Sequence, residues 1–224
     1  MAIHDDELSM LRESLPEYVR LARLGIEFKK DNGGALGYPA ATLLFAVVDT
    51  IGSHLRKRAG LEPYTVTVGG QQQPIKKTAH HFLVLNSPYF GMDLSATEIE
   101  RLYDLSRCPL THNALLGLGV RLTVEQAIPN VIEFREGIAT ISLPDFLKRC
   151  EQAIERFLAE AEKIVAESAA VDELRKESYA RVNAEAIKKL EELARSGNWG
   201  QSAQASGMGR PNRIGTSDPT RRPR

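Results

Sequence analysis

Residues 102–116 read LYDLSRCPLTHNALL, an apolar helical pattern that is interrupted by a proline. The segment carries Arg107 and His112, a permanent cation and a titratable imidazole separated by four residues. In a straight α-helix five positions turn the chain by about 500°, so the two side chains would point about 140° apart. Pro109 predicts a break near Ser106, because proline lacks the backbone N–H and hinders the preceding turn. Such a break offers a way to bring both side chains to one side.

Two amphipathic helices are predicted upstream of this segment. Apolar residues recur every three or four positions across residues 5–30, which indicates a helix. Within it, Ser14-Leu-Pro-Glu17 has the capping-box pattern, and a proline suits the first turn of a helix, so the helix is expected to restart there. Residues 40–58 predict a second helix, which ends in a cationic turn and a glycine.

The sequence between the second helix and the quoted segment is less regular. Residues 61–78 are turn-rich and polar, which predicts a long loop with one short strand at most. Residues 80–91 predict a short helix followed by a turn. Ser95-Ala-Thr-Glu98 is a capping box, and it predicts the start of the helix that runs into the segment.

A β-hairpin and a long helix are predicted after the segment. Residues 131–143 alternate between apolar and polar side chains and turn at Glu136-Gly137. Ser142-Leu-Pro-Asp145 then predicts the start of a long amphipathic helix. Its apolar stripe consists of Phe146, Leu147, Cys150, Ile154, Phe157, Leu158, Ala161, Ile164 and Val165.

The predicted fold is a mainly α-helical domain over residues 1–168 with one inserted β-hairpin. Residues 169–195 predict a charged helix, and the thin apolar content of residues 171–194 favours an exposed face or a protein partner. From residue 196 to residue 224 the chain is rich in Gly, Ser, Pro and Arg and has no period. This composition predicts a disordered basic tail.

Composition limits the class of function. The 224 residues are 42% hydrophobic and 26% charged, which is typical of a soluble globular protein. The formal net charge of zero argues against a nucleic-acid coat protein but not against an enzyme that contacts a few nucleotides. The two cysteines form no CxxC pair, which favours free thiols in a reducing compartment and no metal site. The N-terminus lacks a secretory pattern and no apolar run is long enough for a bilayer, so a cytoplasmic protein without membrane contact is expected.

The segment around Arg107 resembles the motif region of the HEPN domains (higher eukaryotes and prokaryotes nucleotide-binding), which carry Arg-x4–6-His. This spacing alone occurs by chance roughly once in a chain of this composition, so the neighbouring sequence matters. NSPYFG, LSATEIERLY and a hairpin between the motif and the final long helix are also similar to bacterial proteins of this type. The resemblance covers about residues 15–165 and is most specific at residues 86–116.

The resemblance implies a HEPN-like helical bundle that works as a homodimer, with the two motifs facing each other across the interface. It also implies an endoribonuclease that needs no metal or other cofactor, possessing a toxin or defence role. Carried over to this chain, Arg107 and His112 would be the catalytic residues. Histidine can act as acid or base near neutral pH, and arginine can hold a phosphate through two donors. The product RNA would end in a 2′,3′-cyclic phosphate.

An alternative function is a non-catalytic module, since many members of the family only dimerise or bind RNA or a partner. Cys108 stands where the family often has a polar residue, and cysteine is a weak hydrogen-bond partner, which favours this alternative. A purely structural interpretation also exists for the pair. In it, His112 caps a helix end and Arg107 pairs with Asp104 one turn away.

Three further side chains are candidates for supporting the pair. Asp49 interrupts the apolar face of the second helix, so it either orients Arg107 or His112 or is a satisfied structural carboxylate. Asp104 precedes Arg107 by one turn and could tune its electrostatics. Asn113 could contact a phosphate or cap a helix, and the sequence does not separate these roles.

The run KKTAHH places basic side chains in or beside a polar loop. Lys76, Lys77 and His80 could contact RNA phosphates, although such a run is more often a solvated loop that leads into a helix. Adjacent histidines point apart in a helix or strand, so no metal site is expected at this position.

Overall fold

The computed structural model describes residues 6–31, 33–104, 119–124, 128 and 130–196. The chain divides into two compact units, residues 1–175 and residues 176–224. Secondary structure in the described part is mainly helical, with five short strands. The mainly α-helical class that the sequence predicts is therefore confirmed.

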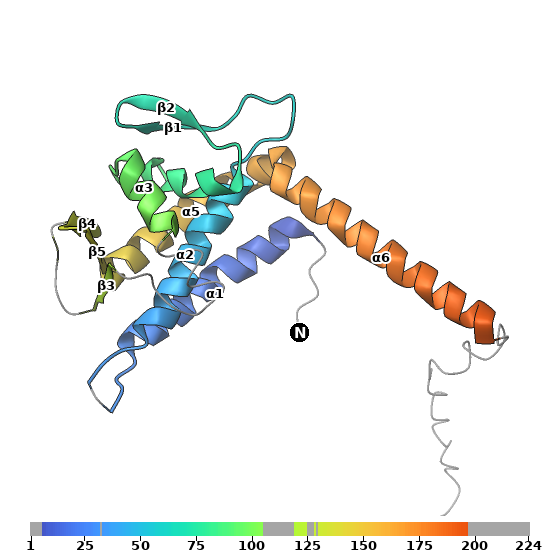
Figure 1. The fold of residues 1–224 in the computed structure, drawn as a ribbon, viewed down its shortest axis with the longest axis horizontal. Coiled ribbons are helices and arrows are strands. Elements are labelled where there is room, and N and C mark those ends of the chain that lie inside the picture. Colours follow the sequence, from blue (N-terminus) through green and yellow to red (C-terminus); the bar gives the residue numbers. More distant parts are fainter. Residues whose placement is uncertain (1–5, 32, 105–118, 125–127, 129, 197–224) are drawn as a thin grey trace, which may run out of the picture. The chain divides into compact units, whose positions relative to one another are not determined.

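Three helices form the core of the first unit: α1 (Glu7–Glu27), α2 (Gly37–His54) and α5 (Leu143–Glu167). Each of the three packs against the other two, and Figure 1 shows α1 alongside α2. Phe45 of α2 packs against α5, with its ring centroid 5.2 Å from that of Phe146. The apolar repeats read from the sequence supply the buried faces of all three helices.

Helix α1 runs through Pro16 without a break. Its N-cap is Asp6, whose carboxylate accepts a 2.7 Å hydrogen bond from the Ser9 N–H, so the expected restart at Ser14 is wrong. An interior proline costs a helix about 3 kcal/mol. Leu11, Leu15 and Val19 are buried on both sides of the proline, and each such side chain contributes about 1.5–3 kcal/mol. Burial of one continuous face therefore outweighs the lost backbone bond.

A three-stranded sheet lies at one end of α5 (Figure 1). Its strands are β3 (Val120–Thr123), β4 (Ile132–Arg135) and β5 (Ile138–Ser142), in the order β3-β5-β4. Strands β4 and β5 form the predicted hairpin, with positive φ angles at Glu136 and Gly137. Strand β3 pairs with β5 in parallel, a partnership that the sequence reading missed. Helix α5 begins directly after β5, which fixes the sheet to the bundle.

The remaining elements are a hairpin, a 3-10 helix and a short helix. The 3-10 helix packs against α2, and the other two pack against the 3-10 helix. Strands β1 (Thr65–Val68) and β2 (Gln71–Pro74) form an antiparallel hairpin, so the expectation of a loop with one strand at most is wrong. The 3-10 helix η1 (Thr78–Asn86) and helix α3 (Ala96–Leu102) follow. The Ser95 side chain accepts from the Glu98 N–H while Glu98 accepts from the Ser95 N–H at 2.8 Å, which confirms the predicted capping box.

The charged region predicted after residue 168 forms helix α6 (Ala169–Ser196), whose first turns belong to the compact unit that ends at Arg175. Backbone hydrogen bonds join its start to the chain after α2: Ala169 N–H donates to Arg56 C=O at 2.8 Å, and Arg58 N–H donates to Glu167 C=O at 3.0 Å. The expected tail lies outside the described residues. Of the helices described, none combines the length and apolarity needed to cross a lipid bilayer.

Candidate functional site

The predicted pair Arg107 and His112 lies outside the described residues, as do Cys108 and Asn113. The structure does describe both ends of the segment that carries them. A Cβ added at Gly119, before β3, would lie 3.5 Å from the guanidinium of Arg101 in α3. The same guanidinium donates to the carbonyl of Gly137 in the β4–β5 turn. The segment of residues 105–118 therefore begins and ends in one neighbourhood of the compact unit.

Asp104 is the last described residue before this segment, and its side chain is exposed. It lines a shallow cavity of about 460 Å³ together with Arg101 and Phe134. The preceding residue, Tyr103, packs its ring edge-on against Phe82 of η1, with 5.5 Å between the ring centroids. This contact holds the end of α3 against η1 and sets where the segment leaves the bundle.

Asp49 lies on α2 and points toward η1. The Nδ1–H of His81 donates to Oδ1 of Asp49 across 3.0 Å, and the His81 side chain is buried. A carboxylate bound to Nδ1 leaves the lone pair of the imidazole on Nε2. Nε2 is buried and has no hydrogen-bond partner among the described residues. The structure thus gives Asp49 the partner that a half-buried carboxylate needs, and whether Asp49 also orients Arg107 or His112 stays a prediction.

The close approach of η1 to α2 depends on Gly52. A Cβ at this position would lie 2.7 Å from the Cα of His81 and closer still to its carbonyl oxygen. Only glycine lets the two backbones come so near. The missing side chain places His81 within hydrogen-bond distance of Asp49, one turn earlier on α2.

Lys76 and Lys77 lie between β2 and η1, and His80 lies in the first turn of η1. Both lysines are exposed, and His80 is half-buried with Nδ1 3.0 Å from the carbonyl oxygen of Pro74. His80 thus contacts the end of β2 while His81 contacts α2, so the adjacent histidines point apart as predicted. The lysines are free to reach phosphate groups in solution, and their RNA contact stays a prediction.

The half-buried His54 and the buried Cys150 both contact the core. Burial lowers the pKa of His54, whose Nδ1 lies 2.8 Å from the carbonyl oxygen of Thr50 and whose ring meets Phe157 edge-on. Burial likewise raises the pKa of the Cys150 thiol, which contacts the carbonyl oxygen of Leu44. A neutral imidazole and a protonated thiol in the core serve packing.

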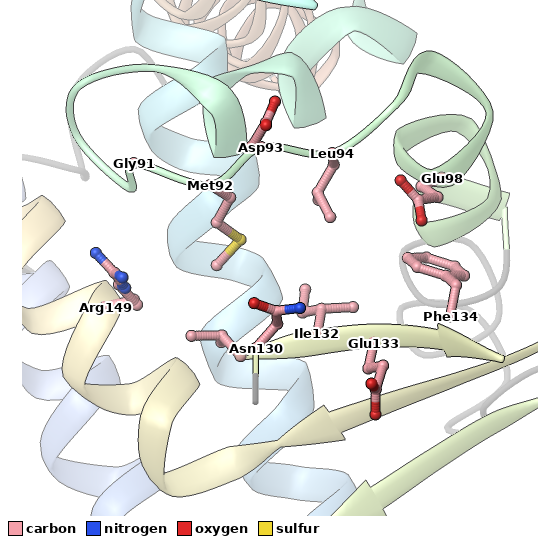
Figure 2. A pocket seen from close by; sticks show the side chains of 11 residues that line it. Gly91, Met92, Asp93, Leu94, Glu98, Asn130, Ile132, Glu133, Phe134 and Arg149 are labelled. Carbon is pink, nitrogen blue, oxygen red and sulfur yellow. The ribbon is translucent and has the colours of Figure 1, made fainter. Parts of the chain in front are cut away.

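A deeper groove, which the sequence did not reveal, lies beside β4 (Figure 2). This β4 groove has a volume of about 630 Å³ and is lined by residues 91–94 and 130–134 together with Glu98 and Arg149. Arg149 is half-buried and forms no hydrogen bond or ion pair with any described residue. In the sequence it is one arginine in a charged helix, and the partners that shape the groove are distant along the chain.

Among the described residues, no group of three His, Cys, Asp or Glu side chains is arranged to hold a metal ion. Comparison with protein-family models, with curated proteins and with solved structures finds no match to this chain.

Proposed function

We propose that this chain is a metal-independent endoribonuclease of the HEPN type, acting as a homodimer with Arg107 and His112 at the interface. The observation that supports it is the pairing of this motif with a helical bundle that holds both ends of the motif segment at one place. Arg101 reaches the β4–β5 turn at Gly137 and lies beside Gly119, so described residues that flank the segment lie close together.

The chemistry needs no group beyond the chain and its RNA. The 2′-oxygen attacks the adjacent phosphorus while the bond from phosphorus to the 5′-oxygen breaks. In the dimer, His112 of one protomer takes the 2′-hydroxyl proton while its counterpart in the other protomer supplies a proton to the 5′-oxygen. Each transfer contributes about 10²–10⁴-fold in rate. Arg107 donates to the phosphate oxygens, where negative charge grows in the transition state. The products are a 2′,3′-cyclic phosphate and a 5′-hydroxyl.

RNA cleavage by the purified full chain in EDTA tests the proposal. Wild type should cleave single-stranded RNA and leave cyclic-phosphate ends, while Arg107→Ala and His112→Ala should lose at least about 10²-fold in rate. Arg12→Ala is the matched control, because Arg12 is an exposed arginine whose described partner is Glu162, far from the motif in sequence. Absence of cleavage across several RNA pools, or a strict need for magnesium, would contradict the proposal.

An exposed apolar stripe on α1 favours the alternative of a non-catalytic dimerisation module. Met10, Leu21, Leu24 and Phe28 are between 45% and 63% exposed. Met10, Leu21 and Leu24 fall within about 60° of one another around the helix, and Phe28 follows as its C-cap. The exposed Glu17 lies on the same face between Met10 and Leu21. An apolar face of this kind indicates an interaction surface. The alternative would hold if wild type forms dimers without cleaving RNA and if substitutions in this stripe, rather than at His112, remove its cellular effect.

A further inference from the structure

Strand β4 is an edge strand of the described sheet. Val131 C=O accepts from the Ser142 N–H at 3.0 Å, and antiparallel strands form such pairs at every second residue. Glu133 and Arg135 therefore also face β5 with their backbone groups, opposite Thr140 and Ile138. The N–H and C=O groups of Ile132 and Phe134 point the other way, away from β5. Among the described residues they have no hydrogen-bond partner.

The β4 groove lies along this free edge. Five consecutive residues of the strand region, 130–134, form one wall, and the loop of residues 91–94 forms the other. In Figure 2, β4 runs along the groove with the loop on its far side from β5. A wall made of consecutive residues means that the groove follows the strand. A strand advances about 3.3 Å per residue, so the edge offers room for four or five extended residues.

The floor of the β4 groove is apolar, whereas polar groups make up most of its accessible lining. Leu94 and Ile132 are almost fully buried beneath it, and Met92 and Phe134 are half-buried at its sides. Unpaired backbone groups beside apolar side chains are the features with which sheet edges bind an added strand. The backbone of an added strand can pair with the Ile132 and Phe134 edge groups, while its side chains meet Met92 and Phe134.

The charges at the two ends of the groove differ in sign. Arg149 stands at the end near Asn130, and Glu98 stands at the end near Phe134 (Figure 2). A Cβ on Gly91 would lie 3.7 Å from the Arg149 guanidinium, so these two residues close the Asn130 end. Glu98 accepts from the backbone and hydroxyl of Ser95 through one carboxylate oxygen, Oε2. Its second oxygen remains to attract a basic group.

We propose that the β4 groove binds the C-terminal segment of a partner protein as an added antiparallel strand. A strand antiparallel to β4 runs from the Phe134 end to the Asn130 end, so its terminal carboxylate reaches Arg149. A basic side chain four or five residues earlier lies at Glu98. The parallel orientation would bring the carboxylate to Glu98, where the like charges repel. This interaction is independent of the proposed ribonuclease activity.

Fluorescence anisotropy with the full chain tests the proposal. The probe is a peptide of sequence Lys-Val-Thr-Val-Thr-Val, labelled at its N-terminus and carrying a free C-terminal carboxylate. It should bind saturably, and either amidation of its C-terminus or Arg149→Gln should weaken binding by about tenfold or more. Lys148→Gln, one position away on the same helix and exposed, should leave binding unchanged. No saturable binding at millimolar peptide, or equal binding by acid and amide, would overturn the proposal.

Backbone pairing has its own readout. Hydrogen exchange should show new protection of the Ile132 and Phe134 amides on binding, while the Glu133 and Arg135 amides are already protected in the free chain. Two peptides that are N-methylated at opposite sets of alternate residues should differ in affinity, because only one set of amides faces β4. Equal binding by both, or no new protection at Ile132 and Phe134, would exclude an added strand. A C-terminally amidated peptide that ends in Asp is the last comparison. If it binds as tightly as the free-acid probe, the groove recognises an internal acidic segment, and the proposal of a terminal carboxylate is overturned.

Discussion

Gly52 decides whether the Asp49–His81 pair can form. Alanine at this position would drive a methyl group into the backbone of His81, which cannot rotate away as a flexible side chain can. We expect Gly52→Ala to lower the free energy of unfolding by about 1–3 kcal/mol or more, as overpacking of a core typically does. Urea denaturation followed by circular dichroism measures the change.

Gly37→Ala is the control for this substitution. Its added Cβ would lie 3.4 Å from a methyl group of Leu143, an ordinary contact with a movable side chain. Its free energy of unfolding should stay near that of wild type or rise slightly, since alanine favours helices. An equal loss in both variants would mean that the approach of η1 to α2 does not limit stability at Gly52.

The sequence marks Asp49 as unusual but does not show that His81 is its hydrogen-bond partner. Asp49 stood out because it interrupts an apolar face, and a buried carboxylate predicts a partner. His81, 32 residues later, could not be assigned as that partner, since pairing across elements depends on how η1 lies against α2. Nothing in the sequence marks Arg149 as a site residue. Its lack of a partner depends on how the folded helix packs and not on its neighbours in sequence.

The β4–β5 hairpin offers a test of turn chemistry. Both central residues of its turn have positive φ angles, 47° at Glu136 and 79° at Gly137. This turn type favours Asn-Gly, because asparagine tolerates the left-handed conformation and glutamate does not. We expect Glu136→Asn to raise the free energy of unfolding by about 0.5–1 kcal/mol. Thermal melting compares the two chains, and an unchanged or lower melting temperature would count against the turn assignment.

The junction of α1 with the start of α6 predicts a pH dependence. Arg175 donates to Glu7 from Nε and from a terminal nitrogen, at 2.6 and 2.8 Å. These bonds lower the pKa of Glu7 from its ordinary 4.5 to about 2. A depressed carboxyl pKa stabilises the folded state fully above pH 4.5 and loses that effect as the pH falls toward 2. Since Arg175 is half exposed, we expect about 1 kcal/mol from the pair.

Glu7→Gln measures this contribution. The variant should be less stable than wild type at pH 6, and the difference should shrink between pH 4.5 and pH 2 in denaturation curves. Glu17→Gln, an exposed carboxylate on the same helix, should show no such dependence. A difference that stays constant down to pH 2 would contradict the ionic origin.

Local patterns predicted most elements, and the errors have local explanations. The Ser95–Glu98 box and the Glu136-Gly137 turn follow from neighbours in sequence, and both were predicted. The β1–β2 hairpin carries a signal too: TVTV alternates and Gly69-Gly70 has the positive φ angles of a tight turn, but its polar partner strand QQQP hid the pairing. The parallel contact of β3 with β5 joins segments 19 residues apart, and no local pattern encodes it.

The exposed apolar residues of α1 predict that the whole chain self-associates. Exposed apolar side chains gathered on one face indicate an association surface, so we expect dimers at micromolar concentration. Leu24→Arg places a charge in the stripe and should shift the chain toward monomer by at least about tenfold in dissociation constant. Leu61→Arg, at an exposed leucine outside the stripe, is the control. Sedimentation velocity distinguishes the species, and a dimer that survives Leu24→Arg would place the interface elsewhere.

The corner between α5 and α6 bears on where this chain can be cleaved by proteases, truncated or fused to another protein. Ser168 separates the two long helices α5 and α6. Backbone hydrogen bonds on both sides of it, from Ala169 to Arg56 and from Arg58 to Glu167, hold the corner. Ion pairs of Arg56 with Glu173, Lys57 with Glu167 and Arg58 with Asp172 join the same segments. Proteases should therefore spare it and cut beyond Arg175. A shortened chain or a fusion partner is best placed after Arg175, where it leaves the fastened corner intact.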